Sequence, residues 1–529
     1  MNRNAIYLTI LLISCFVLLF YNISNYYLWG DEGEIAFYGK SILQFGLPYG
    51  FDGRNLHEVR NGLLHTQNFL PLLHPWLQFY TAALSMKIFG ISTFGARALF
   101  ALLAIMAVLA QYQFVAAYFR NQRLALINTF LLVTSVSFLL FARQCRYFSI
   151  VMLLTPLIGL LYLRYQGRIR EIASACLLFF LFLYANYLIA IPTLAGMAIS
   201  FFLFDDRRKA VRFFLIPLPF LALVTAGYVL WLSQYGIPHN PGLLRNIHPA
   251  DFLRIAWLYI KDYNATQLLP FGILLALLIS WYREGIFKRD ASFAGIRKEV
   301  AVFSIVIIFT FILSFLTPQI SAAQHSDIRY ATAIFPLLIL LQAFVVEKVY
   351  LQRKWAACLL IVLIAGTNIF TFTPFRSYFS EYVRENVLPF DNSVKAAVRF
   401  LDTRIRQDDT VMIIPNHMLG SMEFYLGDRA LFCNVIGEDN RNLLAAGVNL
   451  PRYIYSKDVK PDWIVFFGMY VDLPHTQLHL KNLKLSDYRM HQLPIFGPDV
   501  SRPEIFWRSF DPVQKYLPVS ALWIMERIR

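Results

Sequence analysis

The chain has 529 residues, of which 57% are hydrophobic and 15% are charged, and its mean hydropathy is +0.51. Soluble chains carry about a quarter charged residues and rarely build one core from more than about 250–300 residues, so these values exclude an ordinary soluble domain and indicate a multi-span membrane protein. The net charge of +15 does not indicate nucleic-acid binding, because the Lys and Arg residues gather in short loops between apolar segments. The five cysteines show neither metal-ligand spacing nor a disulfide framework.

Apolar segments long enough to cross a bilayer recur along the chain, and we predict about eleven spans. The first segment lacks a small-x-small cleavage site, so we interpret it as an uncleaved span and not as a signal peptide. The apolar stretch 172–204 is too long for one ordinary span, and Asn186 and Pro192 mark where it is expected to turn or kink. The predicted spans are 5–23, 94–117, 124–141, 147–163, 172–186, 187–204, 212–231, 267–282, 299–316, 330–347 and 355–373.

The charges of the loops between these spans predict the orientation of the chain. If the N-terminus is cytoplasmic, the inner loops are FRNQR, RYQGRIRE, DDRRKAVR, REGIFKRDASFAGIRKE and EKVYLQRK, and each carries a net charge of about +2. The outer segment 24–76 has three bases against five acids. We therefore predict a cytoplasmic N-terminus for this multi-pass protein. The membrane in which we expect it is a bacterial-type inner (plasma) membrane. The two bases in ARQCR (142–146) fall on the outer side and are an exception to this rule.

Two long segments fall on the outer side in this orientation. Residues 24–93 separate the first two spans, and within them EIAFYGKSILQF (34–45) and HPWLQFYTAALSMKIFG (74–90) are predicted to be helices along the membrane interface. We place this loop, together with the spans, in one transmembrane domain of residues 1–373. Residues 374–529 are predicted to form a separate extracytoplasmic, or periplasmic, domain.

The predicted C-terminal domain combines one clear helix with buried strands. DNSVKAAVRFLDTRI (391–405) has apolar residues on one helical face and Asp391 or Asn392 as a cap. TVMIIP (410–415) and DWIVFFG (462–468) are typical of buried strands. The fold class that we predict is therefore mainly α, namely a polytopic transmembrane helical bundle with interfacial helices in its first outer loop and a small C-terminal α/β domain.

Two adjacent acids, Asp31 and Glu32, follow the first span in the stretch YLWGDEGEIAFYG (27–39). Adjacent carboxylates repel each other, and acids close to a bilayer are costly and commonly functional. A carboxylate can take a proton from an acceptor hydroxyl as a general base, and a second acid beside it can hold a metal ion or orient the acceptor. The alternative is a solvated loop in which these acids are incidental.

Bases on the outer side provide candidate contacts for a phosphate. Arg143 and Arg146, with Tyr147 beside them, lie between two spans on the side that the charge rule disfavours. Arginine forms bidentate, charge-assisted hydrogen bonds to phosphate, so a lipid phosphate at the outer surface would account for both residues. The alternative is a pair that contacts lipid headgroups only.

Two histidines and a further arginine extend this set of candidates. His325, Asp327 and Arg329 cluster at the outer mouth of a later span, where His325 and Arg329 could reach a phosphate or Asp327 could simply pair with Arg329. His74 precedes Pro75 at the start of a predicted helix, where the helix dipole favours anions, although a lone histidine is more often structural. Acids and phosphate-binding bases on one membrane face together indicate group transfer from a phosphate-linked donor.

Several short motifs occur in an order that resembles a known superfamily. WGDEGEIAFYGKSIL follows the first span, an HP-W helix then ends in SMKIFGISTFGARALFALLA, and ARQCRYFSIVMLL and IRYATAIFPLLIL come later. An FG-x(5)-AR run ends at Arg97, and an RY-x(5)-P element begins at Arg329. Over residues 5–375 the chain resembles the GT-C superfamily of integral-membrane glycosyltransferases, most closely the group that contains protein O-mannosyltransferases and the lipid A aminoarabinose transferase.

This resemblance implies a reaction. A sugar on a polyprenyl phosphate would be transferred at the outer face to a hydroxyl acceptor, usually with inversion, with Asp31 as the catalytic carboxylate and Glu32 in support. Related enzymes often carry Lys where this chain has His74, and some have a second acid where it has RQCRY, which puts more weight on Asp31. No cofactor is certain; metal dependence varies within the superfamily and leaves a divalent metal ion open, although no clear ligand set is visible in the sequence.

Two other functions stay open at this point. A transporter or flippase for a lipid-linked sugar would place polar groups near the bilayer midplane, whereas the charged residues here gather at one face. A non-catalytic relative would bind lipid or act as a scaffold, which the retained acid pair disfavours. The expected partners are a polyprenyl-phosphate-sugar donor, membrane lipids and a lipid, polysaccharide or protein acceptor, and not nucleic acid; the sequence does not name the sugar.

Overall fold

The protein is built from two compact units. The first comprises residues 1–21, 100–227 and 240–387, and the second comprises the remaining segments. The first outer loop and the C-terminal segment therefore belong to the same unit; the predicted domain boundary at residue 373 stays a prediction. This computed structural model describes residues 3–57, 69–71, 74–233, 249–284, 294–317, 326–373, 375–387, 392–433, 451–455, 459–467, 483–493 and 522–528.

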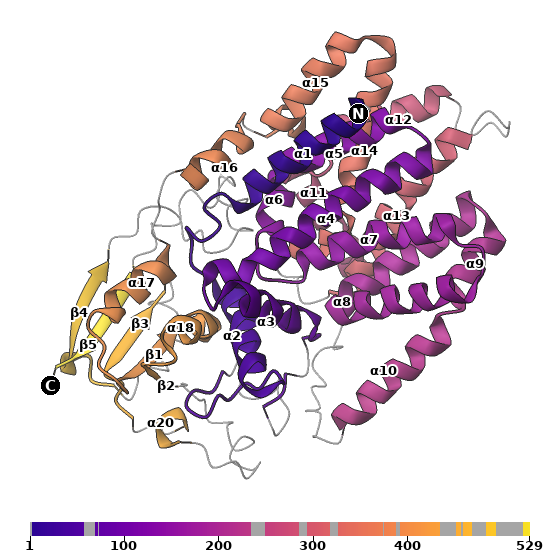
Figure 1. Ribbon diagram of the computed structural model, residues 1–529. Coiled ribbons are helices and arrows are strands. Elements are labelled where there is room, and N and C mark those ends of the chain that lie inside the picture. Colours follow the sequence, from indigo (N-terminus) through magenta and orange to yellow (C-terminus); the bar gives the residue numbers. More distant parts are fainter. Residues whose placement is uncertain are drawn as a thin grey trace. The chain divides into compact units, whose positions relative to one another are not determined.

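The first unit is a bundle of mostly apolar helices (Figure 1). Among the described residues, six helices are long and apolar enough to cross a membrane, or seven if the bent pair α5 and α6 forms one span, and α7 and α15 are shorter apolar helices. The chain is thus a multi-pass membrane protein, as predicted, but the number of about eleven spans is not confirmed. The helices are α1 (Arg3–Phe20), α4 (Thr93–Phe119, which begins in the second unit), α5 (Gln122–Thr134), α6 (Val136–Ala142), α7 (Phe148–Arg164), α8 (Ile169–Phe204), α9 (Arg207–Leu215), α10 (Leu218–Ser233, which ends in the second unit), α11 (Pro249–Ala265), α12 (Phe271–Glu284), α13 (Ala294–Leu316), η4 (Ile328–Ile334), α14 (Phe335–Gln352), α15 (Lys354–Gly366), η5 (Ile369–Thr371) and α16 (Tyr378–Val387).

The long apolar stretch 172–204 lies in α8, a helical run interrupted at one point. Asn186 leaves the helical conformation, with φ −166° and ψ 108°, so the break falls at one of the two residues predicted to mark it. Helix α11 was not predicted, because its Lys261 and Asp262 lower the hydropathy of an otherwise apolar segment. It nevertheless packs against α13 and against η4 in the same unit.

The second unit contains a five-stranded mixed sheet with the strand order β2-β1-β3-β5-β4. β1 is parallel to β2 and β3, whereas β5 is antiparallel to β3 and β4. Successive side chains of β1 point to opposite faces, so that Val411 and Ile413 join the core with α17 and α18 while Met412 and Ile414 pack on the other face. The strands are β1 (Thr410–Ile414), β2 (Leu431–Cys433), β3 (Trp463–Phe466), β4 (Tyr488–Leu493) and β5 (Leu522–Arg527).

Several short helices complete the second unit, and the predicted C-terminal elements are confirmed among them. The predicted helix 391–405 is α17, where the Asn392 side chain caps the helix by accepting a hydrogen bond from the Lys395 N–H. The predicted strands 410–415 and 462–468 contain β1 and β3. The helices of this unit are α2 (Gly30–Phe45), α3 (Leu77–Phe89), α17 (Ser393–Asp402), η6 (Asn416–Met418), α18 (Leu419–Leu426), α20 (Arg452–Tyr455) and η8 (Leu485–Asp487).

Helices α2 and α3 form in the first outer loop as predicted, and α2 packs against both α3 and α18. Glycines permit the close approach of α2 to α18. A Cβ atom on Gly33 would lie 2.3 Å from the backbone nitrogen of Ser421, and one on Gly420 would lie 2.7 Å from that of Glu34. The position of α2 and α3 along the membrane interface stays a prediction.

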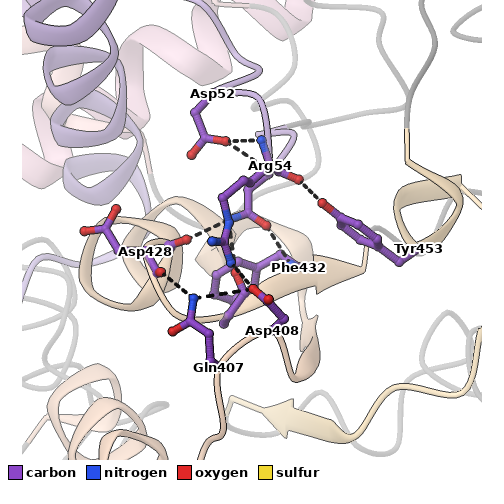
Figure 2. Close-up of polar contacts among 10 residues, drawn as sticks. Asp52, Arg54, Gln407, Asp408, Asp428, Phe432 and Tyr453 are labelled. Atoms are coloured by element: carbon purple, nitrogen blue, oxygen red, sulfur yellow. Dashed lines mark hydrogen bonds and ion pairs between the residues drawn. The ribbon is translucent and has the colours of Figure 1, made fainter.

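A turn in the first outer loop is tied to the C-terminal segment by polar contacts (Figure 2). The Asp52 carboxylate closes the turn by accepting hydrogen bonds from the N–H groups of Arg54 at 2.8 Å and Asn55 at 2.6 Å. The Arg54 guanidinium donates to the Asp408 carboxylate at 2.5 Å, and the Tyr453 hydroxyl donates to the Arg54 carbonyl. These polar contacts hold the first outer loop and the C-terminal segment together within the second unit.

Asn55 extends this connection into the core of the unit. Its side chain is fully buried and donates to the carbonyls of Gly427 at 3.0 Å and Ala430 at 3.2 Å. Its oxygen accepts a hydrogen bond from the N–H of Phe432 in β2 at 2.8 Å. The amide of a buried asparagine is thus satisfied by backbone groups from the opposite end of the sequence.

Candidate active site

Asp31 lies in the first turn of α2 and is half-buried. An acid in this position is favourable, because the N-terminus of a helix carries partial positive charge. Trp29, immediately before the helix, is fully buried and anchors its start in the core. The structure therefore places the predicted catalytic carboxylate at a fixed point with part of its surface accessible.

Glu32 has the opposite surroundings, because it is fully buried and bound to Arg97. The Arg97 Nε donates to one carboxylate oxygen at 2.8 Å, and a second guanidinium nitrogen donates to the other at 2.5 Å. Arg97 also donates to the carbonyls of Ile23 and Tyr26, both at 2.8 Å. This bidentate pair binds the start of α2 to the chain segment before it and to the start of α4.

His74, three residues before the start of α3, lies near Glu34 in the same unit. Its Nε2 is 3.7 Å from a carboxylate oxygen of Glu34, and the two side chains are 35% and 17% exposed. The Glu34 carboxylate therefore lies beside the imidazole that was predicted to contact a phosphate, and its negative charge weakens the attraction of His74 for an anion.

A buried pair between His57 and Glu423 was not predicted. The His57 Nδ1 is 2.7 Å from the Glu423 carboxylate, and both side chains are almost completely inaccessible to solvent. The rings of Phe37 and Tyr38 on α2 pack against the imidazole. Burial raises the pKa of Glu423 above its ordinary value, while the neighbouring His57 acts in the opposite direction. No sequence signal indicates this pair, because its members are 366 residues apart.

In the first unit, the guanidinium of Arg143 is largely occupied by neighbouring groups. It donates to the Tyr382 hydroxyl at 3.2 Å, to the Asn386 side-chain oxygen and to the Tyr21 carbonyl at 3.0 Å. It also lies over the Tyr382 ring. These contacts join α16 to the segment after α6 and leave Arg143 few donors for a phosphate.

The structure brings Arg146, Tyr147 and Arg329 together within the first unit. The Arg146 guanidinium is buried and lies 5.4 Å from the centroid of the Tyr147 ring, and Arg146, Arg329 and Asp327 all act electrostatically on Tyr147. Arg329 donates to both oxygens of Asp327, at 2.7 and 2.5 Å, so the ion pair considered from the sequence is present. His325 lies outside the described residues.

Asp262 on α11 is a further buried acid that was not predicted. One of its carboxylate oxygens accepts hydrogen bonds from the Ser326 N–H at 2.7 Å and from the Ser326 hydroxyl at 2.6 Å. Ser326 directly precedes Asp327, so this contact fixes the segment that carries Arg329. Acids within membrane bundles are commonly functional. The presence of an acid in this otherwise apolar segment is the only sequence feature that could have indicated Asp262.

No group of three His, Cys, Asp or Glu residues within the described parts of the chain could hold a metal ion. The chemistry that the arrangement offers without a metal is a partly accessible carboxylate at a helix N-terminus in one unit and a group of arginines with Tyr147 in the other.

A comparison with solved structures identifies the architecture. The crystal structure of ArnT from Cupriavidus metallidurans bound to undecaprenyl phosphate superposes with a TM-score of 0.55, at 11% identity, covering 98% of this chain and 97% of that one. The chain has the GT-C fold. The oligosaccharyltransferase AglB from Archaeoglobus fulgidus, in complex with an inhibitory peptide and a dolichol-phosphate, shares this GT-C fold at a TM-score of 0.50 and 12% identity, covering 93% and 73% of the two chains.

The apo form of the Archaeoglobus fulgidus oligosaccharyltransferase gives a similar result, with a TM-score of 0.52, 11% identity and the same coverage. No family profile and no curated protein matches the sequence. Because the identities are only 11–12%, these superpositions establish the fold alone and not the activity. The predicted resemblance to GT-C glycosyltransferases is therefore confirmed as a fold.

Proposed function

We propose that the protein is a glycosyltransferase that moves a sugar from a polyprenyl-phosphate-linked donor to a hydroxyl group of a lipid, polysaccharide or protein at the outer face of the membrane. The observation on which the proposal rests is the half-buried carboxylate of Asp31 in the first turn of α2, beside the buried pair of Glu32 and Arg97, in a chain with the GT-C fold. Undecaprenyl phosphate bound to ArnT and dolichol-phosphate bound to AglB support a lipid-phosphate donor.

In the proposed reaction, the acceptor hydroxyl attacks the anomeric carbon from the face opposite the phosphate, which inverts the configuration. Asp31 takes the proton of the hydroxyl as a general base while the new carbon–oxygen bond forms. The bond between the anomeric carbon and the phosphate oxygen breaks, and its electron pair leaves with the polyprenyl phosphate. Glu32 acts through Arg97 as a positioning residue, because both of its oxygens are already bound.

The leaving phosphate requires positive charge, which we assign to Arg146 and Arg329, with Tyr147 beside them. Guanidinium groups bind phosphate through two parallel hydrogen bonds, and their effect is strongest where water is excluded. For Arg329 this requires that a phosphate compete with Asp327 for its donors. Arg143, whose donors are occupied, and His74, which lies near an acid, are weaker candidates.

Reconstitution tests the proposed reaction against the two other functions. The purified protein is placed in proteoliposomes with a set of polyprenyl-phosphate sugars that carry a label in the sugar, together with candidate acceptors. A glycosyltransferase releases unlabelled polyprenyl phosphate and moves the label to the acceptor. A transporter moves the label across the bilayer with the sugar–phosphate bond intact, and a non-catalytic relative binds the donor and does neither; either of these results contradicts the proposal.

The acceptor and the sugar are identified in cells. Mass spectrometry of surface glycans, lipids and proteins from cells with and without the gene should show one sugar missing from one class of molecule. Complementation with the wild-type gene should restore that sugar.

A further inference from the structure

A polar cavity of about 240 Å³ lies in the C-terminal part of the second unit. It is formed where β3 and β4 begin and β5 ends, together with the loop between α17 and β1, and none of its lining residues belongs to α2. Seven of the nine lining residues are charged, so the cavity suits a polar ligand and not an apolar one. The lining residues are Arg404, Arg406, Asp409, Asp462, Trp463, Arg489, Glu526, Arg527 and Ile528.

Four arginines line this cavity, and three of them have no carboxylate within ion-pair distance among the described residues, namely Arg404, Arg406 and Arg489. Arg404 lies over the Phe400 ring at 4.0 Å, which orients its guanidinium. Arg527 donates to the Lys460 carbonyl at 3.0 Å and is only loosely paired with an acid, at 3.8 Å.

The carboxylates in the cavity wall are instead used to hold the fold. Asp409 accepts hydrogen bonds from the Trp463 indole N–H and from the Arg406 backbone N–H, both at 3.0 Å. One Asp462 oxygen accepts both the backbone N–H and the hydroxyl of Thr410. Their charge is therefore directed toward backbone and indole donors, and it does not saturate the guanidinium groups.

Glu526 completes this pattern, because its carboxylate is 3.0 Å from the Nε2 of His491. It faces Arg489 across the antiparallel ladder, yet no ion pair joins these two residues within the described structure. The cavity thus combines guanidinium groups that have no ion-pair partner among the described residues with the Glu526 carboxylate, which keeps some acceptor capacity. Guanidinium groups match a phosphate oxyanion, and carboxylate oxygens match sugar hydroxyls.

We propose that this cavity is a binding site for a sugar phosphate. Its small volume fits one phosphorylated sugar unit, and the excess of four arginines over three acids favours a ligand with negative charge. A phosphate on a lipid headgroup has the same chemistry and is separated from a sugar phosphate by the test. Binding of a sugar phosphate in this cavity does not depend on the proposed transfer reaction.

The test uses the full chain in detergent micelles and isothermal titration calorimetry with glucose 6-phosphate as the probe. We expect saturable binding of glucose 6-phosphate and none of glucose. Each arginine that is lost removes a charge-assisted hydrogen bond to the phosphate and should weaken binding about tenfold or more, which corresponds to about 1.4 kcal/mol or more. We therefore expect a drop of tenfold or more in Arg489→Gln and a larger drop in Arg406→Gln/Arg489→Gln.

Arg429→Gln is the matched control, because Arg429 pairs with Asp402 and does not line the cavity. It should bind glucose 6-phosphate as the wild type does. Absence of saturable binding to the wild type overturns the proposal, whatever the variants do. An equal loss in Arg429→Gln also overturns it, as does binding of the wild type to phosphatidylglycerol vesicles but not to glucose 6-phosphate.

Discussion

Asp31 and Glu32 are neighbours in the chain with different physical tasks. Asp31 keeps part of its surface accessible, whereas both oxygens of Glu32 are bound by Arg97 in a fully buried pair. A buried charge without its partner is costly, so the pair holds the start of α2 in one position. This arrangement makes the accessible acid, and not the buried one, the candidate base.

Arg97→Met should destabilise the protein strongly, because it leaves the Glu32 carboxylate buried without its partner. Removing one member of a buried ion pair costs about 3–5 kcal/mol of unfolding free energy. Denaturant unfolding of the purified protein in detergent measures the loss. Arg54→Met is the control: it breaks the exposed pair with Asp408, whose side chains are 40% and 57% exposed, and should cost about 1 kcal/mol or less. Equal losses in the two variants would contradict the structural role of Arg97.

Glu423 should make the stability of the protein depend on pH. Its pKa is raised from 4.5 by burial, so the folded state holds the proton more tightly than the unfolded state. The resulting contribution to stability is complete below pH 4.5 and is lost as the pH rises through the raised pKa. The glutamine in Glu423→Gln does not titrate. The free energy of unfolding of this variant should therefore rise relative to that of the wild type as the pH rises over this range. A difference that is constant with pH, or that changes in the opposite direction, contradicts the assignment.

The sequence identified candidate site residues, but it did not identify the side chains that they contact. The acid pair stands out in the sequence because acids beside an apolar span are unusual, and that reasoning found Asp31 and Glu32. It could not separate their roles, because Arg97 lies 65 residues from Glu32. The same holds for His57 and Glu423, whose contact depends on the fold and has no local pattern.

At the scale of elements, the packing of α2 on α18 determines where the acids are held. This contact is close because glycines stand on both helices, at Gly33 and Gly420. Helices and strands with a clear period, such as α17 and β1, were predictable from the sequence. Two helices were not predictable from the sequence. Helix α18 is only eight residues long, and helix α11 contains charged residues.

Gly33→Ala tests the packing of α2 on α18. The added methyl group would lie 2.3 Å from the backbone nitrogen of Ser421, which cannot turn away, so the helices must separate. We expect a loss of about 1–3 kcal/mol in unfolding free energy, typical of overpacking. Gly39→Ala on the same helix is the control, because its methyl group would first meet the flexible end of Met86. A loss in Gly39→Ala as large as that in Gly33→Ala would show that the approach of α18 is not what requires glycine.

At the scale of the whole molecule, the chain combines a membrane bundle with a unit that joins the first outer loop to the C-terminal segment. Hydropathy predicted the bundle because apolar length is a strong signal. The joining of residues 22–99 with residues 388–529 could not be predicted, since it depends on contacts such as those of Asn55 with the backbone near β2. The orientation in the membrane rests on loop charge alone and stays a prediction.

Cysteine accessibility tests this orientation. In a background without native cysteines, Gln166→Cys lies in a predicted inner loop, and Met490→Cys lies on an exposed strand position of the C-terminal domain, where Met490 is 58% exposed. A membrane-impermeant maleimide should label Met490→Cys in intact cells or spheroplasts and leave Gln166→Cys unlabelled until the membrane is permeabilised. Labelling in the reverse order would place the whole chain the other way round.

The dependence of sugar transfer on Asp31 is the most direct test of the account. Purified Asp31→Asn is compared with the wild type in the proteoliposome assay, with Asp428→Asn, an 85% exposed acid of the same unit, as the control. Loss of a general base reduces rates by about 10²–10⁴-fold, so we predict a drop of that size in Asp31→Asn, with unchanged thermal stability, and little change in Asp428→Asn. Transfer by a folded Asp31→Asn protein at nearly the wild-type rate would contradict the proposed role of Asp31 as the general base.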